Sequence, residues 1–284
     1  MKSEAWILAV TMFLASMGGR AARAASVQHA ASVPPNAKVS SNWAGYVVSR
    51  RASSRSPFGF TKVSGRWVLP TANCGSTSTI GPTSSAFWVG LGGGEHASGE
   101  VEQAGTEADC SATGVPNYFA WYELAPHSWV HLRLDLEPGN AISASVTVLT
   151  THITIVVRDV SRRTSISKTL RIAVPDTSSA EWIVEAPSRC TTLAFCGEQM
   201  LTNFGTIEFS DGTARSGAHS GPISDGAWIE TPVWLHEGGE PYGGLAPEQN
   251  AAEAVPSALT QEGTAFSVSW RPVSRSKTRS VRAS

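Results

Sequence analysis

Ile-Ser-Ala-Ser-Val-Thr-Val, residues 142–148, is closely followed by Thr-His-Ile-Thr-Ile-Val-Val-Arg-Asp, residues 151–159. Apolar side chains alternate with Ser and Thr in the first stretch, and the second is rich in β-branched residues. Alternation with a period of two places successive side chains on opposite faces of an extended chain. Both stretches therefore predict strands of a sheet that has one buried face.

Similar aromatic and β-branched runs, bounded by Gly, Pro or Ser, extend this pattern along the chain. We predict further strands at residues 46–48, 65–69, 86–91, 118–122, 131–136, 181–185 and 266–270. Residues 237–263 are rich in Gly, Pro and Glu and are predicted as loop, apart from a short helix at residues 248–254 after Pro247. Many short strands with regular turns indicate an all-β sandwich or barrel.

The two ends of the chain differ in composition from its body. Residues 1–24 combine Lys2, an apolar stretch and Ala22-Arg23-Ala24, which predicts a signal peptide and a secreted, extracellular protein; a short membrane anchor is the alternative. Residues 25–38 are expected to be a flexible lead-in or short propeptide. We assign residues 39–271 to one domain and residues 272–284 to a basic disordered tail.

Charge and composition exclude some classes of protein. The chain has 16% charged residues and a formal net charge of −1, and the body without its basic ends is acidic. An acidic body argues against nucleic-acid binding. No other apolar run approaches membrane length, so we expect no membrane association after signal cleavage.

Four cysteines follow the predicted leader, and an even number in an exported chain indicates two disulfides. Of the three possible pairings, we expect the local ones, Cys74 with Cys110 and Cys190 with Cys196. A zinc site is the rival interpretation. It is disfavoured because the sequence has no C-x-x-C pair and no helical histidine pair, so we predict no metal.

The usual motifs of nucleophilic and metal-assisted catalysis do not occur in the sequence. It contains no G-x-S-x-G, H-E-x-x-H, D-T-G or D-S-G pattern. What remains is amides and carboxylates on predicted strands. Glu181 and Glu185, four apart, project to the same face of a regular strand, although a solvated face is the simpler explanation. Gln103 precedes a small-Gly pair, and Glu123 follows two aromatic residues.

Five short motifs nevertheless occur in a suggestive order. They are Ser-Asn-Trp-Ala-Gly-Tyr at 41–46, Ala-Phe-Trp-Val-Gly-Leu at 86–91, Glu-Gln-Ala-Gly at 102–105, Tyr-Phe-Ala-Trp-Tyr-Glu at 118–123 and Ala-Glu-Trp-Ile-Val-Glu at 180–185. Together they resemble the glutamic peptidases, the eqolisin family, over about residues 42–270. The chain departs from the family pattern at Gly92-Gly93-Gly94 and at Phe119, where fungal members carry acidic residues.

The resemblance implies a fold, an activity and a set of site residues. The fold is a sandwich of two antiparallel sheets, a concanavalin-like jelly roll. The catalytic dyad would be Gln103 and Glu185, and the substrate-binding residues would be Trp43, Trp88, Trp121 and Glu123. The Cys190–Cys196 loop would brace the strand that ends in Glu185.

These residue types suit an acid endopeptidase that acts on polypeptides. A carboxylate with an ordinary pKa of roughly 4.3 can serve as general base in acid, where histidine is protonated. Glu185 would activate water, and the Gln103 amide would donate to the oxyanion, an effect commonly worth about 3 kcal/mol. No cofactor is required, and we expect a monomer.

Two alternatives use the same kind of fold. A glycoside hydrolase would employ Glu123 and Glu185 as paired carboxylates, and a carbohydrate-binding module would use the aromatic strands without catalysis. Gln103 distinguishes the first of these from a peptidase, because only the peptidase dyad requires it.

Overall fold

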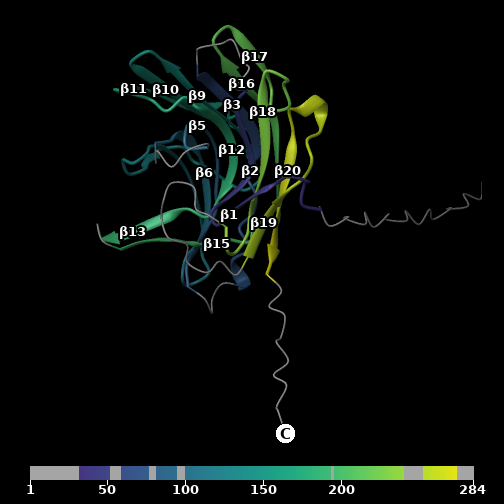
Figure 1. Ribbon diagram of the computed structural model, residues 1–284. Helices are drawn as coiled ribbons and strands as arrows, with labels where there is room; N and C mark the ends of the chain where they lie inside the picture. The colour runs from purple at the N-terminus through teal and green to yellow at the C-terminus, as the bar shows by residue number, and fades with distance from the viewer. Residues whose placement is uncertain are drawn as a thin grey trace, which may run out of the picture. The chain divides into compact units, whose positions relative to one another are not determined.

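Strands make up nearly all the regular structure of this chain in the computed structural model (Figure 1). The structure describes residues 32–51, 59–76, 81–94, 100–192, 195–239 and 252–273, without the side chains of residues 190–192, 195 and 196. The described helical segments are two short 3-10 turns, Cys74–Ser76 and Gln261–Gly263. Neither of them is long or apolar enough to span a bilayer.

One layer of the fold carries the residues singled out above. Its strands, in spatial order, are β8 (Val130–Leu132), β7 (Pro116–Leu124), β6 (Glu102–Cys110), β5 (Ala86–Leu91), β12 (Ser179–Glu185), β2 (Trp43–Arg50), β18 (Trp228–Leu235) and β1 (Lys38–Ser40). Neighbouring strands are antiparallel except β1 and β18, which run parallel.

The second layer packs behind the first. Its order is β11 (Thr164–Arg171), β10 (His152–Asp159), β9 (Ala141–Leu149), β3 (Phe60–Val68), β16 (Thr206–Ser216), β20 (Phe266–Pro272) and β19 (Ala252–Pro256), with β17 (His219–Pro222) beside the end of β16. Among the described residues, one pair, Leu235 with Ala254, joins β18 of the first layer to β19 of the second. Short strands β4 (Thr83–Ser84) and β15 (Met200–Leu201) and the hairpin of β13 (Ser188–Thr192) and β14 (Phe195–Glu198) complete the description.

The main hydrophobic core fills the space between the two layers. The alternating strand β9 buries every second side chain, as the sequence predicted. Two buried indoles cross the core: Trp182 donates from Nε1 to the Ser64 carbonyl oxygen at 2.8 Å, and Trp67 donates to Thr106 Oγ1 at 2.9 Å. The predicted sandwich of two antiparallel sheets is therefore confirmed.

The structure corrects several predictions of local elements. Residues 252–254, predicted as part of a helix over residues 248–254, belong to β19, and residues 248–251 lie outside the described residues. Ala252 and Ala254 are buried there by pairing with β20, so tertiary packing overrides the helical propensity of alanine. The strand predicted at 131–136 is regular only to Leu132.

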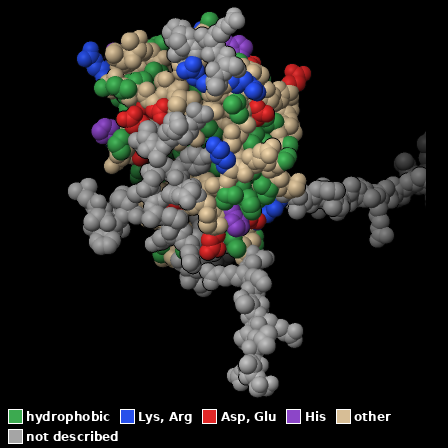
Figure 2. Space-filling model, viewed as in Figure 1, with side chains coloured by type: hydrophobic (Ala, Val, Ile, Leu, Met, Phe, Trp, Pro, Cys, Tyr) green, Lys and Arg blue, Asp and Glu red, His purple; other side chains and the backbone are tan. Residues whose placement is uncertain are grey.

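The predicted leader, residues 1–24, lies outside the described residues, as do residues 274–284 of the predicted tail. Strand β1 begins at Lys38 and β20 ends at Pro272, close to the predicted domain limits. On the face seen in Figure 2, acidic and basic side chains of the described residues are interspersed. The charge on that face is therefore mixed, in keeping with a formal net charge of −1 for the chain.

Candidate active site

The face of the first layer that points away from the main core gathers the predicted site residues. Ile183 lies opposite Trp88, Trp88 opposite Gly105, and Gly105 opposite Trp121. Residues two positions away along each strand share this orientation. We call this surface of β2, β12, β5, β6 and β7 the site face. It therefore carries Trp43, Glu181, Glu185, Gln103 and Glu123.

A second hydrophobic cluster forms the floor of the site face. Its members are Trp43, Val47, Ala86, Trp88, Val101, Phe119, Trp121, Ile183 and Val233. Trp43 and Trp88 meet edge to face, with ring centroids 4.9 Å apart. The three tryptophans predicted to bind substrate are at most 4% exposed. They support the site from below and present little surface of their own.

Glu185, the last residue of β12, is held by a neighbour at each of its two carboxylate oxygens. Trp88 Nε1 donates to its Oε2 at 2.8 Å, and Asn42 Nδ2 lies 3.5 Å from Oε1. Asn42 is itself oriented by Ser40, whose Oγ donates to Asn42 Oδ1 at 3.0 Å. Because separate elements fix both carboxylate oxygens, the carboxyl has a defined direction on the site face.

The electrostatics of Glu185 differ from the expectation of an ordinary carboxyl. Burial, followed by the negative charge of Glu123, raises the pKa of Glu185 to about 8, while hydrogen bonds from Trp43 and Trp88 lower it. Glu198, which accepts a hydrogen bond from Ser41 Oγ at 2.8 Å, raises it further. Burial thus disfavours the ionised form that a general base needs. The sequence did not reveal this burial.

Gln103 faces the same surface from β6, and its side chain is paired with Glu123. The two residues lie opposite each other on adjacent strands, and Gln103 Nε2 donates to Glu123 Oε2 at 2.7 Å. Burial raises the pKa of Glu123, and this hydrogen bond lowers it. An amide nitrogen carries two hydrogens, so one N–H of Gln103 remains to donate elsewhere.

Trp88 is the physical link between the two predicted catalytic residues. Gln103 and Glu185 lie on the strands that flank β5, and Gln103 is opposite Gly90 while Glu185 is opposite Ala86. A Cβ at Gly90 would fall 2.7 Å from Trp88 Cζ3 and 3.2 Å from Gln103 Cβ. The indole therefore spans β5 from the neighbourhood of Gln103 to Glu185. Gln103 and Glu185 therefore lie at diagonally opposite ends of the Trp88 ring. The described contacts include no hydrogen bond between these two residues.

Sequence reasoning missed a polar cluster at the Glu185 end of the site face. Glu107 and Asp109 follow Gln103 on the same face of β6, and both contact Arg189 of β13. The period-two series of Gln103, Gly105, Glu107 and Asp109 is the signal that would have found the two acids. The sequence predicted no strand around Gln103, although Glu102–Cys110 is a nine-residue strand.

Two further carboxyls are buried near the other end of these strands: Glu181 on the site face, and Glu102 on the opposite face of β6. Glu102 is 1% exposed and Glu181 is fully buried. Burial raises the pKa of Glu102 to about 8 and the pKa of Glu181 well above its ordinary value. Hydrogen bonds partly oppose these shifts, from the Asp176 backbone N–H to Glu102 and from Ser179 to Glu181. Both carboxyls are neutral in acid.

The cysteines follow the predicted local pairing as far as the structure describes them. Cys74 and Cys110 form a disulfide, which confirms that prediction. Cys190 and Cys196 lie directly opposite each other in the β13–β14 hairpin, but their side chains lie outside the described part of the chain. Within that part, no group of three or more His, Cys, Asp or Glu side chains has an arrangement that would hold a metal ion.

Two comparisons relate the sequence to known proteins. Residues 41–236 match the model of the peptidase A4 family. The chain is 26% identical over 211 residues to aspergillopepsin-2 of Aspergillus niger, which covers 67% of this chain and 70% of that relative.

Two solved structures share the fold. One is scytalido-glutamic peptidase with a transition state analog inhibitor, at a TM-score of 0.63 and 21% identity, covering 81% of this chain and 98% of that one. The other is aspergilloglutamic peptidase from Aspergillus niger, at a TM-score of 0.52 and 21% identity, covering 66% and 99% respectively.

Proposed function

Since this chain belongs to the peptidase A4 (eqolisin) family of glutamic peptidases and is therefore an endopeptidase acting on polypeptides, we propose that Gln103 and Glu185 are its catalytic dyad. The observation that carries the proposal is the shared site face. A carboxyl fixed by Trp88 and an amide fixed by Glu123 point to the same side of one sheet. Family membership also favours a peptidase over the glycoside hydrolase or binding module that the sequence left open.

In the proposed mechanism an extended peptide lies over the Trp88 indole, between the two residues. Ionised Glu185 takes a proton from water, which attacks the scissile carbonyl carbon. The remaining N–H of Gln103 Nε2 donates to the oxyanion as the carbonyl oxygen gains charge. Glu185 then passes its proton to the leaving amine. Glu123 acts by holding the amide in one orientation, because it accepts the other N–H.

Two groups of carboxyls set the proposed pH range of activity. Glu185 and Glu123 set its acid side, and Glu102 and Glu181 set its alkaline side. The base form of Glu185 is lost as pH falls, and the charge of Glu123 contributes to the raised pKa of Glu185. Protonation of Glu123 in acid removes that repulsion, and the hydrogen bonds from Trp43 and Trp88 still favour ionised Glu185, while burial, the largest cause, still disfavours it. Above this range the buried carboxyls Glu102 and Glu181 lose protons and destabilise the fold. We propose activity on the acid side of neutrality, in a secreted and monomeric enzyme.

Hydrolysis of a denatured protein at several pH values, with mass spectrometry of the products, tests the proposal. Glu185→Gln should abolish cleavage while circular dichroism remains unchanged, because an amide cannot accept the proton of water. A folded Glu185→Gln protein with wild-type activity would refute the dyad. A dead Glu123→Gln beside a fully active Gln103→Ala would instead assign catalysis to the two carboxylates.

A further inference from the structure

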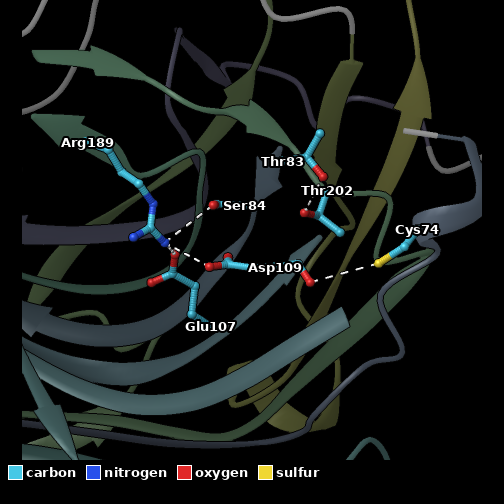
Figure 3. A network of polar contacts seen from close by, with 7 residues as sticks. All are labelled: Cys74, Thr83, Ser84, Glu107, Asp109, Arg189 and Thr202. Atoms are coloured by element: carbon cyan, nitrogen blue, oxygen red, sulfur yellow. Dashed lines mark hydrogen bonds and ion pairs between the residues drawn. The ribbon is translucent and has the colours of Figure 1, made fainter. Parts of the chain in front are cut away.

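Arg189 binds two carboxyls of β6 with one nitrogen atom, as Figure 3 shows. Its Nη2 lies 2.6 Å from Glu107 Oε1 and 2.8 Å from Asp109 Oδ2, and 3.5 Å from Ser84 Oγ. Arg189 is on β13, four residues after Glu185. The contacts therefore fasten the segment that directly follows the proposed general base to the strand that carries Gln103.

The register of the sheet places this cluster beside Glu185. Ala86 of β5 lies opposite Glu185 on one side and opposite Glu107 on the other, so the three residues form one row on the site face. The methyl group of Ala86 is the only side chain between the two acids in that row. Glu107 is 5% exposed, and the negative charge of Glu185 contributes to its raised pKa across this poorly solvated space.

The acceptors of Arg189 are themselves fixed. Asp109 accepts hydrogen bonds from the Ser84 side chain and the Ser85 backbone, and the next residue, Cys110, is tied to Cys74 by the disulfide. Cys74 Sγ lies 3.9 Å from the Asp109 carbonyl oxygen (Figure 3). Arg189 therefore closes onto a rigid end of β6.

The guanidinium also contacts an aromatic stack. Its Cζ lies 6.0 Å from the centroid of the Trp129 ring, which stacks on Phe119 with centroids 5.5 Å apart. Phe119 belongs to the floor of the site face. This second contact holds the guanidinium from the side of the β7–β8 connection and limits its movement.

In the cluster of Arg189, Glu107 and Asp109, the positive charge of the arginine offsets the negative charge of the acids. Burial raises the pKa of both Glu107 and Asp109, and the hydrogen bond between them raises the pKa of Glu107 further while it lowers that of Asp109. The positive charge of Arg189 lowers both pKa values and so offsets the negative charge of the pair. The other charged groups that face Glu185 among the described residues are Glu123 from β7 and Glu198 from β14, and both are acidic. The neighbours from β2 and β5 are the neutral side chains of Asn42, Trp43 and Trp88.

We propose that Arg189 is a positioning residue: it clamps the end of the Glu185 strand to the Gln103 strand and cancels the negative charge beside the proposed general base. The inference rests on the proposed dyad. It assigns no contact with the substrate to Arg189. Loss of the clamp therefore affects the rate of the chemical step and leaves substrate affinity nearly unchanged.

Two opposite changes of charge test the proposal on the full-length protein, with a quenched peptide that the wild type cleaves. Arg189→Gln should lower kcat about tenfold with KM within about twofold, because the dyad geometry loosens. It should also move the acid limb of kcat/KM to higher pH, since Asp109 is left uncompensated. The double variant Glu107→Gln/Asp109→Asn leaves Arg189 uncompensated and should move that limb to lower pH, by about half a unit.

Arg189→Lys keeps the charge but lacks the planar fork, so it should restore the acid limb and only part of kcat. Arg66→Gln is the matched control. Arg66 lies on β3, outside the site face, and its Nη1 is 3.1 Å from Asp211 Oδ2. Removing this charge should change neither kcat nor the acid limb.

Three results would overturn the clamp: unchanged kcat in Arg189→Gln, acid limbs that move in the same direction in both charge variants, or limbs that do not move at all. A purely structural role would lower the melting temperature and leave the limbs in place. An inactive Glu185→Gln together with an unaffected Arg189→Gln would refute the clamp while preserving the dyad.

Discussion

Trp88 Nε1 donates a 2.8 Å hydrogen bond to Glu185 Oε2, and the far edge of the same ring lies over Gly90, next to Gln103 Cβ. One fully buried side chain thus sets the positions of both proposed catalytic groups. The hydrogen bond favours the ionised form of Glu185, which burial disfavours. The balance between these two effects governs the first prediction.

Trp88→Phe should keep most of the ring packing and remove the donor. The carboxylate of Glu185 then loses a charge-assisted hydrogen bond, so its pKa rises and the acid limb of kcat/KM moves up by about one unit. Trp228→Phe is the control, because Trp228 is also buried but donates to the carbonyl oxygens of Pro222 and Ile223. An acid limb that stays in place in Trp88→Phe would contradict the prediction.

Gln103→Ala should lower kcat by about a hundredfold or more with little change in KM, as expected for a donor that acts in the transition state. Gln103→Glu should retain some activity only at the lowest pH, where a protonated carboxyl can still donate. Steady-state kinetics across pH, with circular dichroism as a check on folding, decides between the two outcomes. Equal loss in both variants at every pH would argue against an oxyanion role.

Stability should decrease as the pH rises from about 4.5 to about 8. Glu102 and Glu181 have raised pKa values in the folded protein, so between the unfolded and folded values the native state binds more protons. Each unit of increase in pH then favours the unfolded chain. Urea titrations at pH 4, 6 and 8 measure the slope, and Glu181→Gln should flatten it. A free energy of unfolding that rises over this range would show that these carboxyls are ionised in the fold.

Replacing Cys74 and Cys110 by alanine should destabilise the fold by about 2 to 5 kcal/mol, because the disulfide closes a long loop, with a sequence separation of 36. Thermal unfolding of the double variant measures the loss.

Non-reducing peptide mapping should also find a Cys190–Cys196 bond, since the backbone sets these residues opposite each other. A link from Cys74 to either of them would contradict both expectations.

Alternation of apolar and polar residues was sufficient to predict the strands that build the core, such as β9 and β10. It failed for β11, whose residues are mostly exposed or half-buried and therefore show no apolar period. β6 was also missed as a strand: it is buried on both faces, so its acids and glycine resemble a turn. Such strands are set by neighbouring strands and not by local propensity.

The position of the dyad followed from the order of short motifs, but its environment did not. The raised pKa of Glu185 depends on the depth of burial and on Glu123, which lies in a different motif on a different strand. Arg189 follows the Glu185 strand closely in sequence, but its partners are on β6, so only the folded sheet reveals the pairing. Long-range electrostatics has no counterpart in local sequence pattern.

The close approach of Trp88 to its two glycine neighbours restricts what substitutions the enzyme tolerates. A Cβ at Gly105 would collide with the Phe87 carbonyl oxygen and lie 2.6 Å from Trp88 Cβ, and one at Gly90 would lie 2.7 Å from the Trp88 ring. A methyl group added at Gly90 would therefore displace the indole, and one added at Gly105 would displace the backbone of β5 that carries it. In a saturation mutagenesis scan, these two residues without side chains should therefore be as intolerant of change as Glu185.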